Sequence, residues 1–251
     1  MFHITLNYWG WKVKLSADRF SLLDQVRQLL PPGLPVAGPA DSHFELHSSG
    51  LFLNGERVTL AESEEVLLEA LEGSFQIEVA SHAPEAVFVH AGVVGMGGQV
   101  LLLPGKSFAG KSTLVHALCK RGADYFSDEY AVINHQGRVQ PYRRPITLRQ
   151  SSSGRRRIPA EQFPLDPEAA PRSLGWAISC QYGVANSWSV QPVTCGQGVL
   201  TLLSNTVSAR LSPQRDLVYL ARAAESCQFF EGLRGEVDEA VEKILALAEL
   251  R

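Results

Sequence analysis

A glycine-rich octapeptide is the stretch of this sequence best suited to chemistry. Residues 105–112 read Gly-Lys-Ser-Phe-Ala-Gly-Lys-Ser and fit the pattern G-x-x-x-x-G-K-[ST]. Glycines let backbone N–H groups converge on phosphate oxygens, and the start of the following helix adds partial positive charge. Lys111 can bridge terminal phosphates, and Ser112 can offer its hydroxyl to Mg²⁺. The pattern predicts a loop that binds ATP and Mg²⁺, formed by Gly105, Lys106, Ser107, Phe108, Ala109, Gly110, Lys111, Ser112 and Thr113.

The segments on both sides of this loop have the pattern that a phosphate-binding loop requires. Residues 100–103 form a continuous apolar run, which is typical of a strand buried on both faces of a sheet. Residues 113–121 have helical character and end at Gly122, a residue common after helix ends. The loop thus lies between a predicted strand and a predicted helix, and this order argues against a chance match to the pattern.

Two adjacent acids interrupt the next apolar segment, residues 125–133. Asp128 and Glu129 stand in the middle of this predicted strand, where charges are costly unless they are paired or bound to a metal. The alternative is that both acids are solvated on a surface strand. The first interpretation predicts a metal site made by Ser112 and Asp128.

These segments together resemble a known family. The stretch 89–92 (Val-His-Ala-Gly), the glycine-rich loop and the stretch 127–129 (Ser-Asp-Glu) resemble the catalytic domain of the HPr kinase/phosphorylase family and HPr-kinase-related P-loop kinases, and distantly phosphoenolpyruvate carboxykinase. His90 precedes Lys111 by 111−90 = 21 residues, and the acids follow Lys111 by 128−111 = 17 and 129−111 = 18 residues. The resemblance covers residues 86–148 and implies an α/β P-loop kinase domain.

The resemblance also implies roles for individual residues. Lys111 and Ser112 would bind the β- and γ-phosphates and the metal. Glu129 would be the general base, His90 would orient or assist it, and Asp128 would be the nearer metal ligand, although the division of roles between the two acids stays open. A histidine buried in the core with a satisfied hydrogen bond is the alternative for His90.

Several positions depart from the pattern of true HPr kinases. Thr113 stands where these kinases usually carry Glu, the acidic pair is Asp-Glu instead of Asp-Asp, and their later Gly-rich segment is absent. Residues 141–149 instead look like the Pro-Arg-Pro segment of the HPr-kinase-related proteins. Neither phosphorolysis nor HPr as substrate is therefore implied.

Basic residues follow the acidic strand. Arg143, Arg144 and Arg149 could reach a γ-phosphate or an acidic substrate group, or could belong to a solvated basic loop. Residues 150–157, rich in Ser, Gly and Arg, could form a lid or a peptide-docking loop, or simply solvated surface.

The pattern of strands and helices along the whole chain predicts two domains. Residues 1–62 have short alternating runs at 2–6, 11–15, 43–47 and 51–53, turns at 7–10 and Asn54-Gly55, and a helix at 20–30 that stops at Pro31. We expect a small α+β module there and the P-loop catalytic domain in residues 63–251, which begins with a helix. Later elements are expected as strands at 174–182, 188–194 and 227–230 and helices at 198–209, 213–224 and 237–250.

Composition narrows the class of protein. The 251 residues are 45% hydrophobic and 20% charged with a net charge of −3, which argues against a protein that mainly binds nucleic acid or an anionic membrane. The four cysteines lie far apart in the sequence, and their spacing is not that of metal ligands. The N-terminus lacks the apolar core of a signal peptide. We therefore expect a soluble cytoplasmic protein.

These observations predict an ATP-dependent kinase that phosphorylates a hydroxyl, first of all a Ser or Thr of a peptide or protein. The related kinases include enzymes that modify ribosomally made peptides such as lasso peptide precursors. The alternatives are a non-catalytic ATP-binding sensor or scaffold and a kinase of a small hydroxyl-bearing metabolite. A GTPase is disfavoured because no Asn-Lys-x-Asp motif occurs. HPr kinases are hexamers, so a homo-oligomer stays open.

Overall fold

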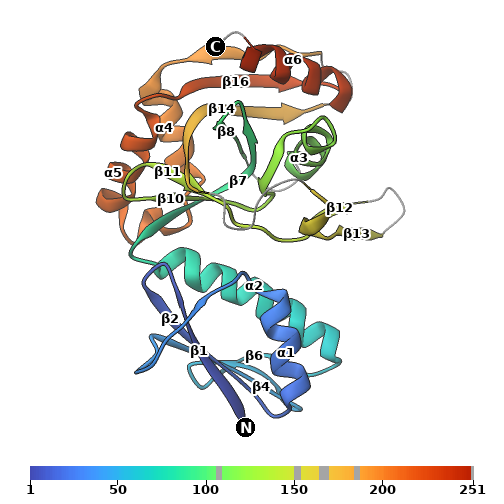
Figure 1. Cartoon of the computed structure of the whole chain (residues 1–251), viewed down its shortest axis with the longest axis vertical. Helices are drawn as coiled ribbons and strands as arrows, with labels where there is room; N and C mark the ends of the chain where they lie inside the picture. Colours follow the sequence, from blue (N-terminus) through green and yellow to red (C-terminus); the bar gives the residue numbers. More distant parts are fainter. Residues whose placement is uncertain (106–108, 150–153, 164–169, 184–186, 250–251) are drawn as a thin grey trace. The chain divides into compact units, whose positions relative to one another are not determined.

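The computed structural model describes residues 1–105, 109–149, 154–163, 170–183 and 187–249. The chain forms two compact units, Met1–Glu85 and Ala86–Arg251 (Figure 1). The division thus follows Glu85, whereas the sequence suggested residue 62. Helix α2 (Glu64–His82) explains the difference, because its Phe75 ring packs on Tyr8 and Phe44 of the first unit, with centroids 4.8 and 6.2 Å apart.

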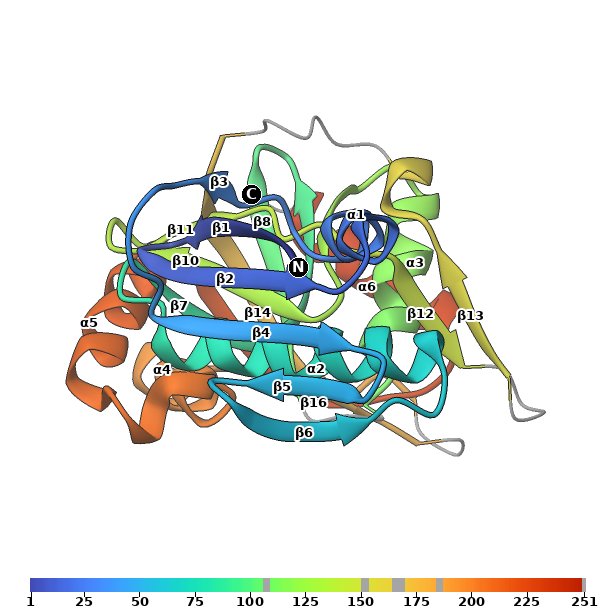
Figure 2. The same cartoon turned by 90° about the horizontal axis from the view of Figure 1, so that it is seen from below.

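The first unit is a mixed six-stranded sheet with the strand order β3-β1-β2-β4-β5-β6 (Figure 2). Neighbouring strands are antiparallel except β2 and β4, which run parallel. Helix α1 (Phe20–Leu29) lies between β2 and β4 in sequence and ends before Pro31, as predicted. The strands are β1 (Phe2–Tyr8), β2 (Trp11–Ala17), β3 (Leu34–Pro35), β4 (Ser42–His47), β5 (Gly50–Leu53) and β6 (Glu56–Leu60).

Two tight turns determine the register of this sheet. Trp9 and Gly10 join β1 to β2, and Asn54 and Gly55 join β5 to β6. All four residues have positive φ, as a two-residue hairpin turn of type I′ requires. Both turns were predicted from the sequence and are confirmed.

The second unit is built on an eight-stranded sheet of the order β11-β10-β7-β8-β14-β16-β15, with β9 also paired to β7. The three strands β8, β14 and β16 run parallel, so their carboxyl ends lie at one edge. The strands are β7 (Ala86–Met96), β8 (Gln99–Pro104), β9 (Asp124–Ser127), β10 (Tyr130–Asn134), β11 (Arg138–Gln140), β14 (Arg172–Tyr182), β15 (Gln191–Val193) and β16 (Gln228–Arg234).

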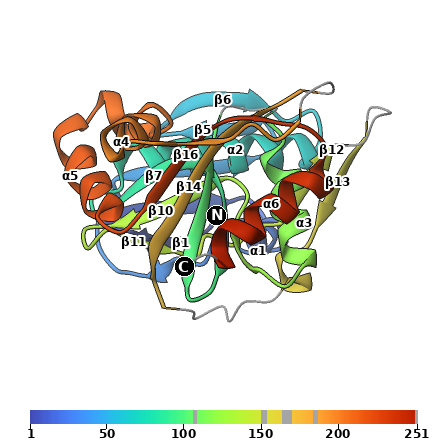
Figure 3. The ribbon, with the colours of Figure 1, turned by 90° about the horizontal axis from the view of Figure 1, so that it is seen from above.

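Helices cover both faces of this sheet (Figure 3). Helices α3 (Lys111–Lys120) and α6 (Val237–Glu249) pack on one face, over Leu101, Leu103 and Ile178 among others. Helices α4 (Cys195–Ser204) and α5 (Pro213–Ala224) pack on the other, over Val100 and Leu102 among others. Consecutive residues of β8 therefore point into opposite cores, which explains its unbroken apolar run.

Smaller elements complete the second unit. Strands β12 (Ile146–Arg149) and β13 (Arg155–Ile158) form a separate hairpin whose Ile146 and Ile158 join the core under α3. Residues 155–157 therefore belong to a strand, whereas the sequence suggested a lid or docking loop over 150–157; residues 150–153 lie outside the described part. Two 3₁₀ turns, Ala160–Gln162 and Val207–Arg210, follow the hairpin and α4 respectively.

Other predicted boundaries moved by a few residues. The expected helix 198–209 begins earlier, at Cys195 of α4, because Thr194 and Gln197 form a capping box, and it ends at Ser204. The expected strand 188–194 is reduced to β15. None of the helices in the described ranges combines the length and apolarity needed to span a membrane.

Candidate active site at the glycine-rich loop

The glycine-rich loop joins the end of β8 to the start of α3, as the sequence predicted. Gly110 immediately precedes α3 and has φ 79° and ψ 21°, a left-handed conformation that favours glycine. The amide groups of the first turn of α3 have no helical partner and remain available to an anion. Lys106, Ser107 and Phe108, three of the predicted nucleotide-binding residues, lie outside the described residues.

Lys111 is held inside the loop. Its side chain is buried, and its Nζ donates hydrogen bonds to the Gly105 carbonyl oxygen at 2.8 Å and to His90 Nε2 at 3.1 Å. Burial lowers the pKa of Lys111, and the nearby carboxylates of Glu129 and Asp128 counter this effect. The ammonium group therefore belongs to the first residue of α3, is held by a carbonyl oxygen and an imidazole nitrogen, and lies near two carboxylates.

His90 lies at the centre of the site, on β7. An ammonium group can only donate, so the Nε2 that faces Lys111 acts as acceptor and the ring proton is on Nδ1. Nδ1 in turn lies 3.4 Å from Glu129 Oε1. Burial and the positive charge of Lys111 lower the pKa of His90 to about 4, while a hydrogen bond to the backbone of Glu129 acts in the opposite direction. His90 is thus neutral at pH 7 and connects Lys111 to Glu129.

The acidic pair lies at a break between two strands. Both β9 and β10 pair with β7, and Asp128 and Glu129 occupy the two positions between them. The Ser127 hydroxyl accepts hydrogen bonds from the amides of Glu129 and Tyr130, both at 3.1 Å, and so stabilises the break. The expectation that these charges lie in the middle of a strand was wrong, because strand pairing with β7 is interrupted at residues 128 and 129. The two side chains therefore have different surroundings.

Asp128 is the buried member of the pair. Its carboxylate accepts hydrogen bonds from the Ser112 hydroxyl and from the Thr147 amide at 3.3 Å, and the Tyr125 hydroxyl lies 3.4 Å away. Burial and the neighbouring Glu129 raise its pKa to about 6. The alternative of a solvated surface acid is wrong for Asp128, which is only 8% exposed.

Glu129 is the more open acid. Its side chain keeps 35% of its surface exposed and faces His90. Its backbone carbonyl accepts from the Ala91 amide at 3.1 Å, which ties the break to β7. The two acids therefore have different surroundings, one buried beside α3 and one open beside His90, and different surroundings support different chemical tasks.

The oxygen atoms near α3 fit a magnesium ion. The Ser112 hydroxyl and the Asp128 carboxylate are in direct contact, and both are hard oxygen ligands. Mg²⁺ in nucleotide sites is typically held by one or two protein side chains together with phosphates and water. The residue pair predicted from the sequence is thus brought together and has suitable chemistry.

The three candidate arginines have different surroundings. Arg143 Nη2 donates to the carbonyl oxygens of Ala160 at 2.5 Å and Phe163 at 3.3 Å, so this side chain anchors the segment after β13. The positive charge of Arg144 lowers the pKa of Asp128, which places it near the acidic pair. The side chain of Arg149 lies outside the described part of the structure. Thr113, the last predicted loop residue, is exposed.

Arg234 is a component of the site that the sequence did not reveal. It ends β16, is 3% exposed, and its Nη2 donates to the carbonyl oxygens of Ala109 at 3.4 Å and Gly110 at 3.3 Å. A Cβ at position 110 would collide with this guanidinium group, which is a second reason for glycine there. No motif marks Arg234, because 124 residues separate it from Gly110.

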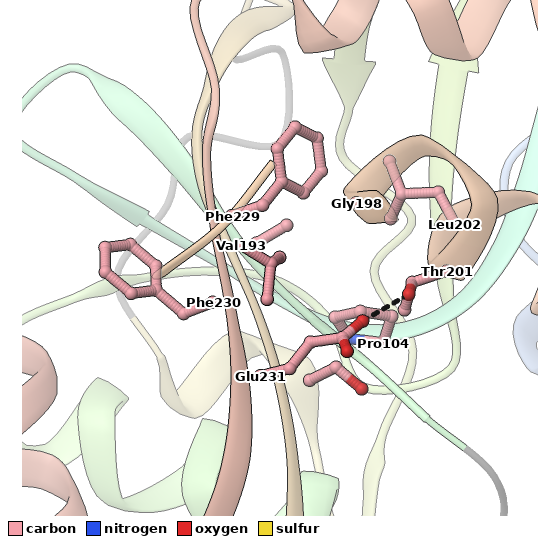
Figure 4. Close-up of a pocket in the computed structure, with 10 residues that line it drawn as sticks. Pro104, Val193, Gly198, Thr201, Leu202, Phe229, Phe230 and Glu231 are labelled. Carbon is pink, nitrogen blue, oxygen red and sulfur yellow. Dashed lines mark hydrogen bonds between the residues drawn. The ribbon is translucent and has the colours of Figure 1, made fainter. Parts of the chain in front are cut away.

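A separate pocket lies on the α4 face of the sheet (Figure 4). Apolar side chains such as Phe229 and Leu202 make up most of its wall, and Glu231 accepts a hydrogen bond from Thr201. It contains none of the residues that surround Lys111. The pocket is therefore distinct from the candidate site described above.

Comparisons with known proteins give little further information. No family model matches the chain, and no curated protein matches it. Among solved structures, the Hpr(Ser) kinase/phosphatase from Coxiella burnetii is similar with 15% sequence identity and a TM-score of 0.36, over 65% of this chain and 99% of that one. This similarity is too low to establish a common fold, so function must be argued from the side chains themselves.

Proposed function

We propose that this protein is an ATP-dependent kinase that transfers the γ-phosphoryl group to a hydroxyl group, preferentially of a Ser or Thr in a peptide or protein. The observation that carries the proposal is the continuous chain of contacts from Lys111 through His90 to Glu129, next to the Ser112–Asp128 pair. Phosphoryl transfer requires charge neutralisation and a carboxylate near the attacking hydroxyl, and the Lys111 ammonium and the Glu129 carboxylate would serve these two needs.

The phosphate end of the site is formed by the loop and α3. Backbone amides at the start of α3 and the Lys111 ammonium would bind the β- and γ-phosphate oxygens. Ser112 and Asp128 would hold Mg²⁺, which supplies additional positive charge to the phosphates. A bound cation would also keep Asp128 ionised despite its burial.

Glu129 is the proposed general base. It would take the proton of the acceptor hydroxyl while the hydroxyl oxygen forms a bond to the γ-phosphorus. The bond between the γ-phosphorus and the β,γ-bridging oxygen breaks at the same time, and ADP is the leaving group. Its exposed carboxylate can meet an incoming hydroxyl, whereas Asp128 is enclosed. His90 Nδ1 donates to the backbone of Glu129 and lies 3.4 Å from its Oε1, so His90 would act as a positioning residue for this acid.

The nature of the acceptor rests on the resemblance of the sequence motifs to HPr-kinase-related proteins that modify peptides. The exposed position of Glu129 is compatible with a peptide side chain as acceptor. A kinase of small metabolites would use the same loop and the same base, so peptides and small hydroxyl compounds are compared as acceptors in one assay.

The test uses purified full-length protein with ATP, Mg²⁺ and three sets of acceptors: Ser/Thr peptides, free serine and small hydroxy acids. We expect label from the γ-phosphate on a peptide hydroxyl. Glu129→Gln should keep its affinity for ATP and lose about 10²–10⁴-fold in rate, while Lys111→Ala should lose nucleotide binding or turnover. Glu225→Gln, a change of an exposed acid away from the loop, is the matched control.

The outcomes separate the candidate functions. Label on serine or a hydroxy acid alone would replace the peptide by a metabolite as acceptor. If the folded wild-type protein binds ATP but transfers phosphate to none of these acceptors, the kinase proposal fails and a nucleotide sensor explains the site.

A further inference from the structure

The layout of the sheet indicates which way a bound nucleotide would run. Ligands of open α/β sheets bind outside the carboxyl ends of the parallel strands. On one side of β8 lies β7, which carries His90 and pairs with the strands that flank Asp128 and Glu129. On the other side lie β14 and β16. If the proposed function holds, the γ-phosphate faces the acids, and the nucleoside extends over the ends of β14 and β16.

An aromatic ring and a cation occupy those two strand ends. Tyr182 ends β14 and Arg234 ends β16, and the two residues are paired in the parallel ladder. The Arg234 guanidinium carbon lies 4.9 Å from the centroid of the Tyr182 ring, a cation–π contact. The same guanidinium binds the Ala109 and Gly110 carbonyl oxygens. Arg234 therefore contacts both the Tyr182 ring and the glycine-rich loop.

The Tyr182 ring is held in place yet remains open to solvent. Its hydroxyl donates to Glu236 Oε1 at 3.1 Å, and Arg234 covers one part of its surface. The residue nevertheless keeps 42% of its surface exposed. An aromatic ring that is held in place and partly exposed loses little conformational entropy when a flat ring stacks on it.

We propose that Tyr182 is the surface on which the base of the bound nucleotide stacks, with Arg234 linking this base subsite to the phosphate-binding loop. The inference rests on the proposed function, because the acids define the direction of the triphosphate. The chemical class of ligand is a nucleoside triphosphate. Stacking on an aromatic side chain tolerates different bases, so this subsite strengthens binding more than it selects adenine.

Two ligands separate the base from the phosphates. ATP with Mg²⁺ carries both parts, whereas inorganic tripolyphosphate with Mg²⁺ carries only the phosphates. Isothermal titration calorimetry gives the Kd of each ligand for the wild-type protein, Tyr182→Phe, Tyr182→Leu and Tyr182→Ala. Leu233→Ala is the control, because Leu233 neighbours Arg234 on β16 and has the same 42% exposure as Tyr182.

Tyr182→Ala and Tyr182→Leu should each weaken ATP binding about tenfold and leave tripolyphosphate binding unchanged. Tyr182→Phe should keep the wild-type affinity for both ligands, since it retains the ring. Tyr182→Leu still covers Arg234, so it keeps the test valid if Tyr182→Ala folds poorly.

Other results would overturn the inference. Equal losses for ATP and tripolyphosphate would mean that Tyr182 only supports the loop through Arg234, and unchanged ATP binding in all variants would mean that the base lies elsewhere. If wild-type protein binds neither ligand, the proposed function itself fails, and the base subsite fails with it.

Discussion

His90 should remain neutral far below the usual pH range of histidine, and this has a measurable effect on stability. Lowering its pKa from 6.5 to about 4 means that protonation costs about 3 kcal/mol more in the folded than in the unfolded chain. The cause is burial beside the Lys111 ammonium, which would repel an imidazolium and already occupies Nε2.

The sign of the effect follows from proton binding in the two states. Above pH 6.5 the imidazole is neutral in both states, so it contributes no pH dependence. Between pH 6.5 and about 4 the unfolded chain binds a proton that the folded chain does not, and stability falls as the pH decreases. At about pH 5 this amounts to about 2 kcal/mol. A quarter of the side chain is exposed, so solvent screening reduces the expected loss to about 1 kcal/mol.

The assay compares wild-type protein with His90→Gln. Urea unfolding at about pH 7.5 and about pH 5 should show that the wild type loses about 1 kcal/mol more than the variant. His135→Gln, at an exposed turn position, is the control and should behave as the wild type does. Histidine ¹⁵N–¹H NMR spectra, assigned by the signal missing in His90→Gln, should show a titration midpoint near 4 and a proton on Nδ1. A midpoint at 6.5 or above, or a proton on Nε2, would refute the reasoning.

Two further predictions concern packing around the sheet. Arg234→Met should lower the free energy of unfolding by about 2 kcal/mol and weaken the binding of ATP and of tripolyphosphate to the same extent, because the Ala109 and Gly110 carbonyl oxygens lose a charged donor. Urea unfolding measures the stability and calorimetry measures the two affinities. Unchanged affinity for both ligands would contradict this prediction. Gly198→Ala should cost about 1–3 kcal/mol, because a Cβ there collides with the Phe229 ring. Gly196→Ala, in the same helix with open space around it, should be neutral or stabilising by up to about 1 kcal/mol, and equal thermal unfolding of the two variants would argue against this packing.

Local features of the chain were predictable from the sequence. The turn predicted within residues 7–10 is confirmed and narrowed to Trp9-Gly10, and the Asn54-Gly55 turn, the end of α1 before Pro31 and the order β8, loop, α3 are confirmed. Each depends on residues close together in the chain: positive φ in a turn, the missing N–H of proline, or apolar periodicity. The roles assigned to the residues of the loop remain predictions.

Tertiary structure decided the boundary between the units and the surroundings of the acids. Helix α2 carries an apolar face that the sequence shows, but only packing against Tyr8 and Phe44 assigns it to the first unit. Likewise, residues 125–133 read as one strand, and only pairing with β7 shows the interruption that buries Asp128 and leaves Glu129 open.

The sequence by itself determined that a glycine-rich loop, a histidine and two acids occur in one order and at set spacings. Only the folded sheet decided that His90 carries its proton on Nδ1, that Arg234 binds the loop from a distant strand, and that Tyr182 lies beside it. The physical reason is that turns and helices depend on neighbours along the chain, whereas protonation, burial and ring contacts depend on charges and surfaces that long-range strand pairing brings together.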